Sequence, residues 1–191
     1  MKAWTENYKI LSDFFLVPDQ EDLKKEHTRL FSLTVAGGVP PYETEYGHKD
    51  IFFKTQRLAD IAGFYRAFGM EIADGGRIDF IGAELELMHW IALKEKYALE
   101  AGKKEQAQIC QDAAVKFMLD HLGRWGSYFG DQLTQSARHP FYQSVGRRLS
   151  QFIEAECRRL DVQPERVTGW NPEPISTTEF ECGGNSSSEV T

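Results

Sequence analysis

Three carboxylates, Asp79, Glu84 and Glu86, lie among apolar residues in the stretch IDFIGAELELM at residues 78–88. Carboxylates can act as general acid and base, or can hold a cation through charge-assisted hydrogen bonds. Glu84 and Glu86 cannot share one substrate, because residues two apart point in different directions on a helix. They are expected either to be solvated, or to leave Glu84 at the edge of a groove, paired with an Arg or Lys of a bound peptide. We expect Asp79 to be the N-cap of the helix, with one oxygen free to face a ligand.

His121 and Trp125 lie one helical turn apart in the stretch HLGRW at residues 121–125. We expect His121 to be a buried or half-buried histidine bonded to a backbone carbonyl, and Trp125 either to shape a pocket with it or to pack. A small helical hydrolase based on His121 would need a nucleophile or a metal ion beside it. The sequence offers neither at recognisable spacing, so it predicts no catalytic residue and no metal site.

The cysteines and the glycine pairs carry no cofactor motif. Cys110, Cys157 and Cys182 are widely spaced, without a CxxC pair, which predicts a reducing compartment and no zinc site. Cys110 and Cys157 fall on helical patterns and are expected to be buried. The glycine pairs at 37–38 and 75–76 lack the Lys and the strand of a phosphate loop, so no nucleotide or other cofactor is predicted.

Apolar residues recur at helical spacing along most of the chain, and no alternating segment of useful strand length is found. The helices that this pattern predicts cover residues 19–33, 50–68, 79–101, 104–122, 127–134 and 140–160, with a short helix within 1–17. The predicted fold is all-α: a single-domain helical bundle of about six main helices, with short loops that imply antiparallel packing.

Several helix boundaries carry local signals. Asp19 and Asp50 precede helical patterns and are expected to be N-caps. Gly69 and Gly102 lie where a glycine commonly ends a helix. Pro140 falls in the first turn of the last helix, where the missing N–H costs nothing.

The composition changes after residue 161. Residues 162–191 contain a GGNSSS stretch, several prolines and more Glu than Arg. We therefore expect a helical domain over 1–161 and an acidic, irregular C-terminal tail over 162–191. Trp170 and Phe180 could dock part of this tail on the body.

The chain carries a net charge of −7 over 191 residues. An acidic surface argues against a nucleic-acid partner, which requires cationic groups, and favours a basic partner. The N-terminus lacks the apolar core of a signal peptide, and no run approaches the ~20 apolar residues of a membrane span. We expect a cytoplasmic protein without a membrane span.

The chain resembles the TorD/DmsD/NarJ family of cytoplasmic chaperones for molybdenum oxidoreductases. The matching segments span about residues 27–157, and their order and spacing make the combination specific. They are Arg29-Leu30-Phe31, YETEYG at 42–47, LADIAGFYRAFG at 58–69, IDFIGAELELM at 78–88, HLGRW at 121–125 and Phe141-Tyr142. The segments at 42–47 and 58–69 look most like the branch that serves nitrate, selenate, dimethylsulfide and ethylbenzene enzymes.

This resemblance implies an all-helical protein without catalytic activity or a cofactor of its own. It implies binding to the precursor of a molybdopterin oxidoreductase catalytic subunit, often through the twin-arginine signal peptide, until the molybdopterin cofactor is inserted. The family's loop Pro-x-Asp-His is replaced here by the residues at 77–80, in which Asp79 matches and Phe80 stands in place of the His. Leu30, Phe31 and Tyr42 match positions that the family uses on its binding face.

A binder of a twin-arginine peptide needs carboxylates beside an apolar groove. We expect Glu43, Glu45, Asp79 and Glu84 to supply the charge. We expect the groove to be lined by Leu30, Phe31, Tyr42, Tyr46 and Phe80, with His121 and Trp125 beside it.

Two other functions stay open at this point. The protein could be a stable accessory subunit of a redox complex, or a small helical hydrolase using His121 with a carboxylate. It is expected to be a monomer or a dimer, and the loops at 34–49 and 70–77 are possible hinges for helix exchange between protomers.

Overall fold

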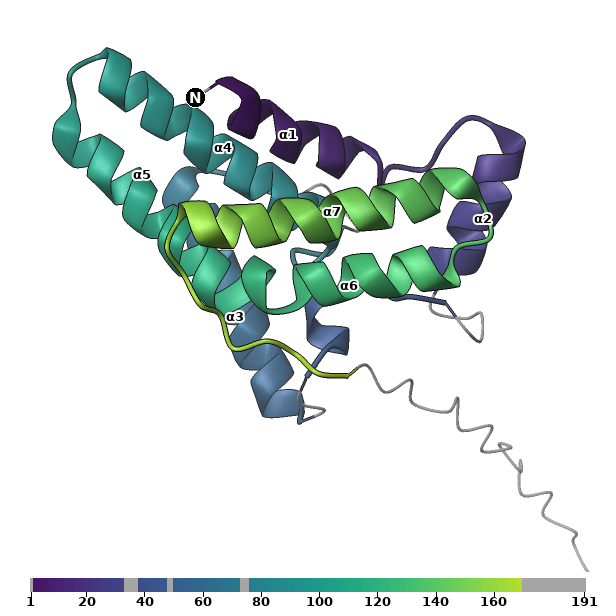
Figure 1. Cartoon of the computed structure of the whole chain (residues 1–191). Coiled ribbons are helices and arrows are strands. Elements are labelled where there is room, and N and C mark those ends of the chain that lie inside the picture. Colours follow the sequence, from purple (N-terminus) through teal and green to yellow (C-terminus); the bar gives the residue numbers. More distant parts are fainter. Residues whose placement is uncertain (1, 33–37, 48–49, 73–75, 170–191) are drawn as a thin grey trace, which may run out of the picture.

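The computed structural model of the chain describes residues 2–32, 38–47, 50–72 and 76–169. It confirms the all-α fold class, because the described residues form helices and no strand beyond one isolated bridge. The α-helices are α1 (Lys2–Asp13), α2 (Glu21–Phe31), α3 (Ile51–Phe68), α4 (Ile81–Glu100), α5 (Lys104–Phe117), α6 (Gly123–Ser136) and α7 (Pro140–Arg159) (Figure 1). A 3-10 turn, η1 (Glu43–Glu45), precedes α3, and a π-helical turn, η2 (Met118–Leu122), joins α5 to α6.

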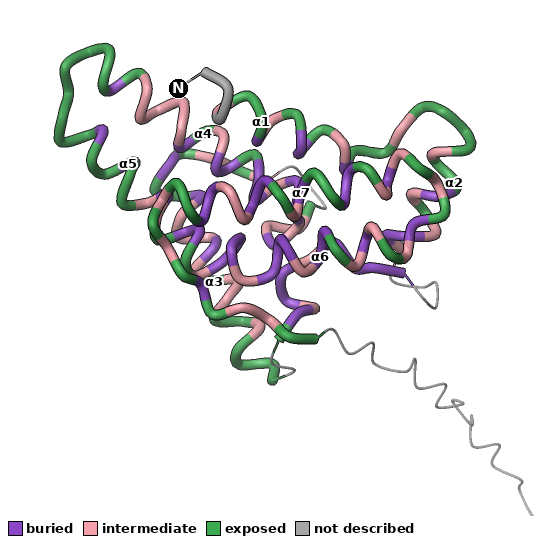
Figure 2. Tube along the Cα trace, in the orientation of Figure 1, coloured by how far each residue is buried: buried purple, intermediate pink, exposed green. Residues whose placement is uncertain are grey.

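The helices pack as two antiparallel pairs with further helices against them. Helices α4 and α5 form the first pair, and α1 packs along α4. Helices α6 and α7 form the second pair (Figure 1). Buried residues follow the inward faces of these helices (Figure 2). One continuous apolar core runs from Tyr8 in α1 to Cys157 in α7. No helix of the described residues is both long enough and apolar enough to cross a membrane.

Two glycines set the close approach of α6 and α7. A Cβ atom added at Gly130 would lie 2.7 Å from the carbonyl oxygen of Gly146, and one added at Gly146 would lie 2.5 Å from that of Gly130. Both distances are shorter than any real Cβ contact, so a larger residue would push the two helices apart. The glycines therefore fix the position of α6, which carries Trp125.

The local boundary signals are confirmed except for one. Asp50 caps α3 by accepting a hydrogen bond from the backbone N–H of Phe52 at 2.7 Å, and Gly69 ends this helix with a φ of 67°. Gly102 likewise follows α4 with a φ of 70°, and Pro140 is the first residue of α7. The cap predicted at Asp19 is wrong.

At the start of α2, Gln20 occupies the N-cap position and makes no capping hydrogen bond through its side chain. Glu21 and Asp22 lie in the first turn, where their charges complement the positive end of the helix dipole. This helix start is thus stabilised by charge, without a capping side chain.

The predicted break between residues 122 and 127 is also wrong. The π turn η2 leads directly into α6, so the helical path continues through Gly123. A Cβ atom at Gly123 would lie 2.3 Å from the carbonyl oxygen of Met118. Glycine thus permits the wider turn, which occurs most often as an insertion within a longer helix.

The first part of the expected C-terminal tail lies on the body. The backbone N–H of Val167 donates to the carbonyl of Arg124 at 3.0 Å, and Arg166 pairs with Glu154 at 2.7 Å. The remainder, including Trp170, lies outside the described residues, as do Phe180 and Cys182. Parts of the expected hinges at 34–49 and 70–77 lie outside them as well. Two of the cysteines, Cys110 and Cys157, are buried, as predicted, and their thiols are free.

Candidate functional site

The segment at 42–47 lies directly on the start of α4. Tyr42 and Phe80 form an isolated antiparallel bridge, and their rings lie 6.0 Å apart. The backbone N–H of Glu43 donates to the carbonyl of Asp79 at 2.9 Å. The fold thus brings together two of the motifs on which the predicted site depends.

Asp79 anchors this contact and does not cap α4. Its side chain is fully buried and accepts hydrogen bonds from the Thr44 hydroxyl at 2.7 Å and from the Thr44 backbone N–H at 3.2 Å. Arg77 donates to both of its oxygens, at 3.0 and 2.8 Å, and stacks over the Tyr42 ring. The N-cap position of α4 is occupied by Phe80. The N-cap role predicted for Asp79 is therefore wrong, and neither of its oxygens is left free for a ligand.

His121 lies fully buried between two carboxylates. Its Nδ1 is 3.0 Å from Oε2 of Glu43, and its Nε2 is 3.1 Å from Oδ2 of Asp60. Glu43 also faces Arg57 at 3.6 Å. The predicted burial of His121 is confirmed, but the predicted backbone carbonyl partner is wrong. This arrangement ties together η1, α3 and η2, which are distant in sequence.

The carboxylates around His121 do not make a metal centre. In the part of the chain that the structure describes, no group of three or more His, Cys, Asp and Glu side chains is arranged to hold a metal ion. Both ring nitrogens of His121 already face carboxylates, and the ring has no exposed surface. The His121 ring is therefore not exposed to a substrate in this structure.

Glu84 is fully buried, so neither the solvated position nor the groove edge expected for it is correct. Its Oε2 accepts a hydrogen bond from Nε1 of Trp125 at 3.2 Å, while its Oε1 has no hydrogen-bond partner among the described residues. Burial, reinforced by the neighbouring charge of Glu43, raises the pKa of Glu84 well above its usual range. Glu86 is exposed, as expected for a solvated carboxylate.

The predicted groove residues are mostly packed in the core. Tyr46 stacks on Trp125 with ring centroids 5.2 Å apart, and its hydroxyl donates to the carbonyl of Pro40. Leu30 and Phe31 are buried as well. Of the eleven residues on which we based the site, only Tyr42, Glu45 and Phe80 are partly exposed. The other eight, all buried, are Leu30, Phe31, Glu43, Tyr46, Asp79, Glu84, His121 and Trp125.

A pocket of about 130 Å³ opens above this buried cluster. Its floor includes three of the predicted residues, Glu43, Tyr46 and Trp125. Its lining is completed by Thr44, Gly47, Phe53, Lys54, Arg57, Arg124, Glu165 and Val167. The structure thus assembles the pocket from η1, α3, α6 and the segment after α7.

Most of the pocket wall was not predicted from the sequence. One signal for it was present at residues 51–53, where three bulky apolar residues follow the cap Asp50. Consecutive helical residues point in different directions, so three in a row cannot all face the core. No such signal predicted that residues 165–167 line the pocket, because their position depends on the path of the chain after α7.

The fold and the site define an all-α protein with a buried polar cluster beneath an open surface pocket. The chain belongs to the nitrate reductase delta subunit family, whose model matches residues 1–130.

Two relatives have names that describe their roles. The chain is 26% identical over 190 aligned positions to the chlorate reductase assembly chaperone protein of Ideonella dechloratans, covering 86% of this chain and 93% of that protein. It is 29% identical over 112 positions to the selenate reductase assembly chaperone protein of Thauera selenatis, covering 58% of this chain and 56% of that protein. Both relatives are assembly chaperones of reductases.

Proposed function

We propose that the protein is an assembly chaperone that binds the precursor of a molybdopterin oxidoreductase catalytic subunit. It acts in the cytoplasm and holds the precursor until the molybdopterin cofactor is inserted. The observation that carries this proposal is the alignment with the chlorate reductase assembly chaperone, which extends over 86% of the chain. An alignment of this extent is not confined to one motif.

The surface supports a role in binding a polypeptide. Ile51, Phe52 and Phe53 are exposed together at the start of α3, beside the pocket. Contiguous apolar side chains exposed on a folded protein commonly mark sites of protein–protein interaction. A chaperone activity also requires no reacting group, in keeping with the enclosed position of His121.

The finer part of the proposal is that the client still carries its twin-arginine signal peptide. The net charge of −7 supports this, because an acidic protein attracts a basic segment. Asp79 is held by Thr44 and Arg77, and Glu84 is buried. In this arrangement, the arginines would have to pair with other carboxylates.

The test is a pull-down with the full-length tagged chain from the native cytoplasm, with partners identified by mass spectrometry. We expect a reductase catalytic subunit precursor whose signal peptide is intact. Recovery of the mature enzyme alone would instead support a stable accessory subunit, and recovery of no redox partner would contradict the proposal. The tag expressed alone in the same cells is the control.

A further inference from the structure

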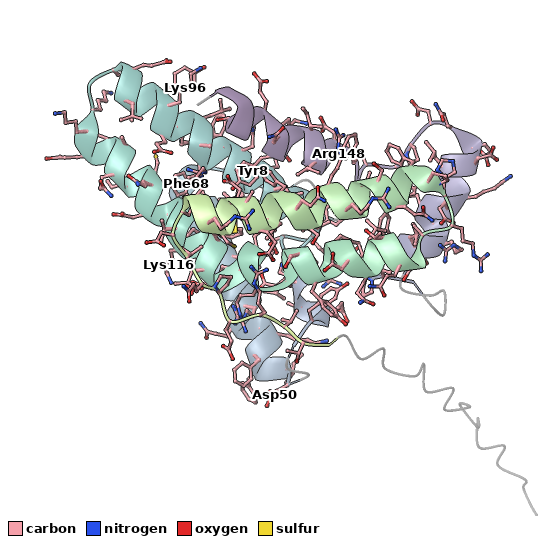
Figure 3. The ribbon with its side chains drawn as sticks, in the orientation of Figure 1. Tyr8, Asp50, Phe68, Lys96, Lys116 and Arg148 are labelled. Carbon is pink, nitrogen blue, oxygen red and sulfur yellow. The ribbon has the colours of Figure 1, made fainter. Side chains whose placement is uncertain are left out.

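The start of α3 projects bulky apolar side chains into solvent. Ile51 is 69% exposed, Phe52 81% and Phe53 53%. They directly follow Asp50, which lies at the tip of α3, far from the α4–α5 end of the molecule marked by Lys96 (Figure 3). We call residues 51–53 the α3 triplet. Exposing so much apolar surface at one place is unfavourable unless a partner covers it.

The pocket beside the α3 triplet is lined by Lys and Arg side chains that lie far from the nearest carboxylates. The nearest carboxylate oxygen lies 3.8 Å from Lys54 Nζ, 3.6 Å from Arg57 Nη1 and 3.9 Å from Arg124 Nη2. These distances exceed those of hydrogen bonds. By contrast, Arg29 and Arg159 elsewhere in the protein form bidentate pairs with carboxylates at 2.7–2.8 Å.

The pocket cations therefore keep donors available for another acceptor. Arg57 donates to the carbonyl of Asp120, and Arg124 donates through Nε to the carbonyl of Glu165. A guanidinium has five N–H donors and an ammonium has three, so most of these donors have no acceptor among the described residues. The cations on the wall also outnumber its carboxylates, Glu43 and Glu165, in a chain whose net charge is negative.

We propose that the α3 triplet and this pocket together dock one segment of the client polypeptide, in which an acidic side chain stands beside bulky apolar side chains. The apolar side chains cover Ile51 and Phe52, and the carboxylate enters the pocket to accept hydrogen bonds from Lys54 and Arg57. Phe53 belongs to both surfaces, because it is part of the triplet and lines the pocket. This inference rests on the proposed function, which supplies the client. Because cations outnumber carboxylates on the pocket wall, the pocket favours an acidic segment over a basic one.

The direct test places a photo-crosslinking amino acid, p-benzoyl-phenylalanine, at position 52 of the full-length chain. The matched control places it at position 97, because Tyr97 is also an exposed aromatic residue but lies on α4 beside Lys96. After irradiation in the native cytoplasm, mass spectrometry identifies the crosslinked client peptide. We expect a peptide from the catalytic subunit with an Asp or Glu next to apolar residues, formed at position 52 and not at 97. A crosslinked segment without an acidic residue would overturn the inference.

Substitutions give a second readout. Phe52→Ser and Lys54→Glu are expected to lower the amount of client recovered by about tenfold each, which corresponds to the loss of one well-buried contact. Tyr97→Ser and Lys96→Glu, which make the same kinds of change at the other end of the molecule, are expected to leave recovery unchanged. All four side chains lie at the surface, and circular dichroism would verify that each variant is folded.

The outcomes separate this inference from the proposed function. If the wild-type chain recovers the precursor and the Phe52 and Lys54 variants recover it equally well, the client docks elsewhere and only the inference fails. If the wild-type chain recovers no precursor, the proposed function fails and the inference fails with it. Loss of recovery confined to the Phe52 and Lys54 variants supports both.

Discussion

Nδ1 of His121 lies 3.0 Å from Oε2 of Glu43, although the two residues are 78 positions apart in the chain. The contact joins the 3-10 turn η1 to the π turn η2, and Asp60 of α3 holds the other ring nitrogen. Glu43 also lines the pocket. The buried histidine therefore positions the floor of the candidate site without facing a ligand itself.

We predict that His121→Phe destabilises the protein by roughly 1–3 kcal/mol, because Glu43 would remain buried with one fewer polar partner. Urea denaturation measures the change in the free energy of unfolding. In a double-mutant cycle with Glu43→Gln, the two effects should not add, and the interaction energy should exceed about 0.5 kcal/mol. Strict additivity would show that the contact contributes nothing to stability.

The raised pKa of Glu84 leads us to predict that stability depends on pH. Because burial raises its pKa, the folded protein keeps this proton at pH values where the unfolded chain, with a usual pKa of 4.5, has released it. The stability of the wild type should therefore fall, relative to Glu84→Gln, as the pH rises above about 4.5. Denaturation curves from pH 4 to 9 would measure this difference. Glu86→Gln, two residues along on the exposed face, is the control and should run parallel to the wild type.

The lowered pKa of Glu26 leads us to predict the opposite dependence of stability on pH. Arg29 donates two hydrogen bonds to its carboxylate, and the backbone N–H groups of Arg138 and His139 donate two more. The Arg29 guanidinium is the main cause that lowers the pKa of Glu26 to about 2. The resulting stability is present above the usual pKa of 4.5 and is lost as the pH falls toward 2.

Replacing Glu26 with Gln should therefore cost roughly 1–3 kcal/mol at pH 7 and almost nothing near pH 2. Thermal unfolding followed by circular dichroism across this range would measure the difference. Glu86→Gln, the same change at an exposed residue of α4, serves as the comparison. A pH-independent loss for the Glu26 variant would mean that packing, rather than charge, accounts for the effect.

The spacing of α6 and α7 leads to a prediction at Gly146. In Gly146→Ala, the new methyl group would press against the carbonyl of Gly130 and against Thr134. We expect a loss of about 1–3 kcal/mol, typical of overpacking. Gly63→Ala is the control, because a Cβ at that helical position meets no neighbour within 4 Å. There, the substitution should be neutral or stabilising, since Ala is the better helix former.

The local features of the fold were predictable, because their causes lie within a few residues. Asp50, Gly69 and Pro140 act on the backbone of their own helix, so the sequence around each one is sufficient. The π turn differs, because its cause is the room that Gly123 leaves for the carbonyl of Met118. A pattern of apolar residues does not predict how much space a backbone carbonyl has.

The sequence indicated that two of the candidate site's motifs lie together, but not which of their residues are buried. The motifs around Tyr42 and Phe80 do lie together. The burial of Glu84 was missed, because it depends on Trp125, which lies 41 residues further along the chain. The spacing of residues along a helix shows which of them share a face. Their burial depends on which other helices cover that face.

The last prediction concerns Asp79, which the sequence placed at the binding surface and the structure places beneath it. Asp79→Asn should weaken the hydrogen bonds that Arg77 and Thr44 now make to a charged acceptor, lowering stability by about 1.5–3 kcal/mol. Because Asp79 holds the segment at 42–47 against α4, client recovery should fall in parallel with thermal stability and return when binding is measured at lower temperature. Phe52→Ser, in contrast, should reduce recovery at every temperature without lowering the melting temperature. A stable Asp79→Asn protein that fails to bind its client at all temperatures would instead place Asp79 in direct contact with the client.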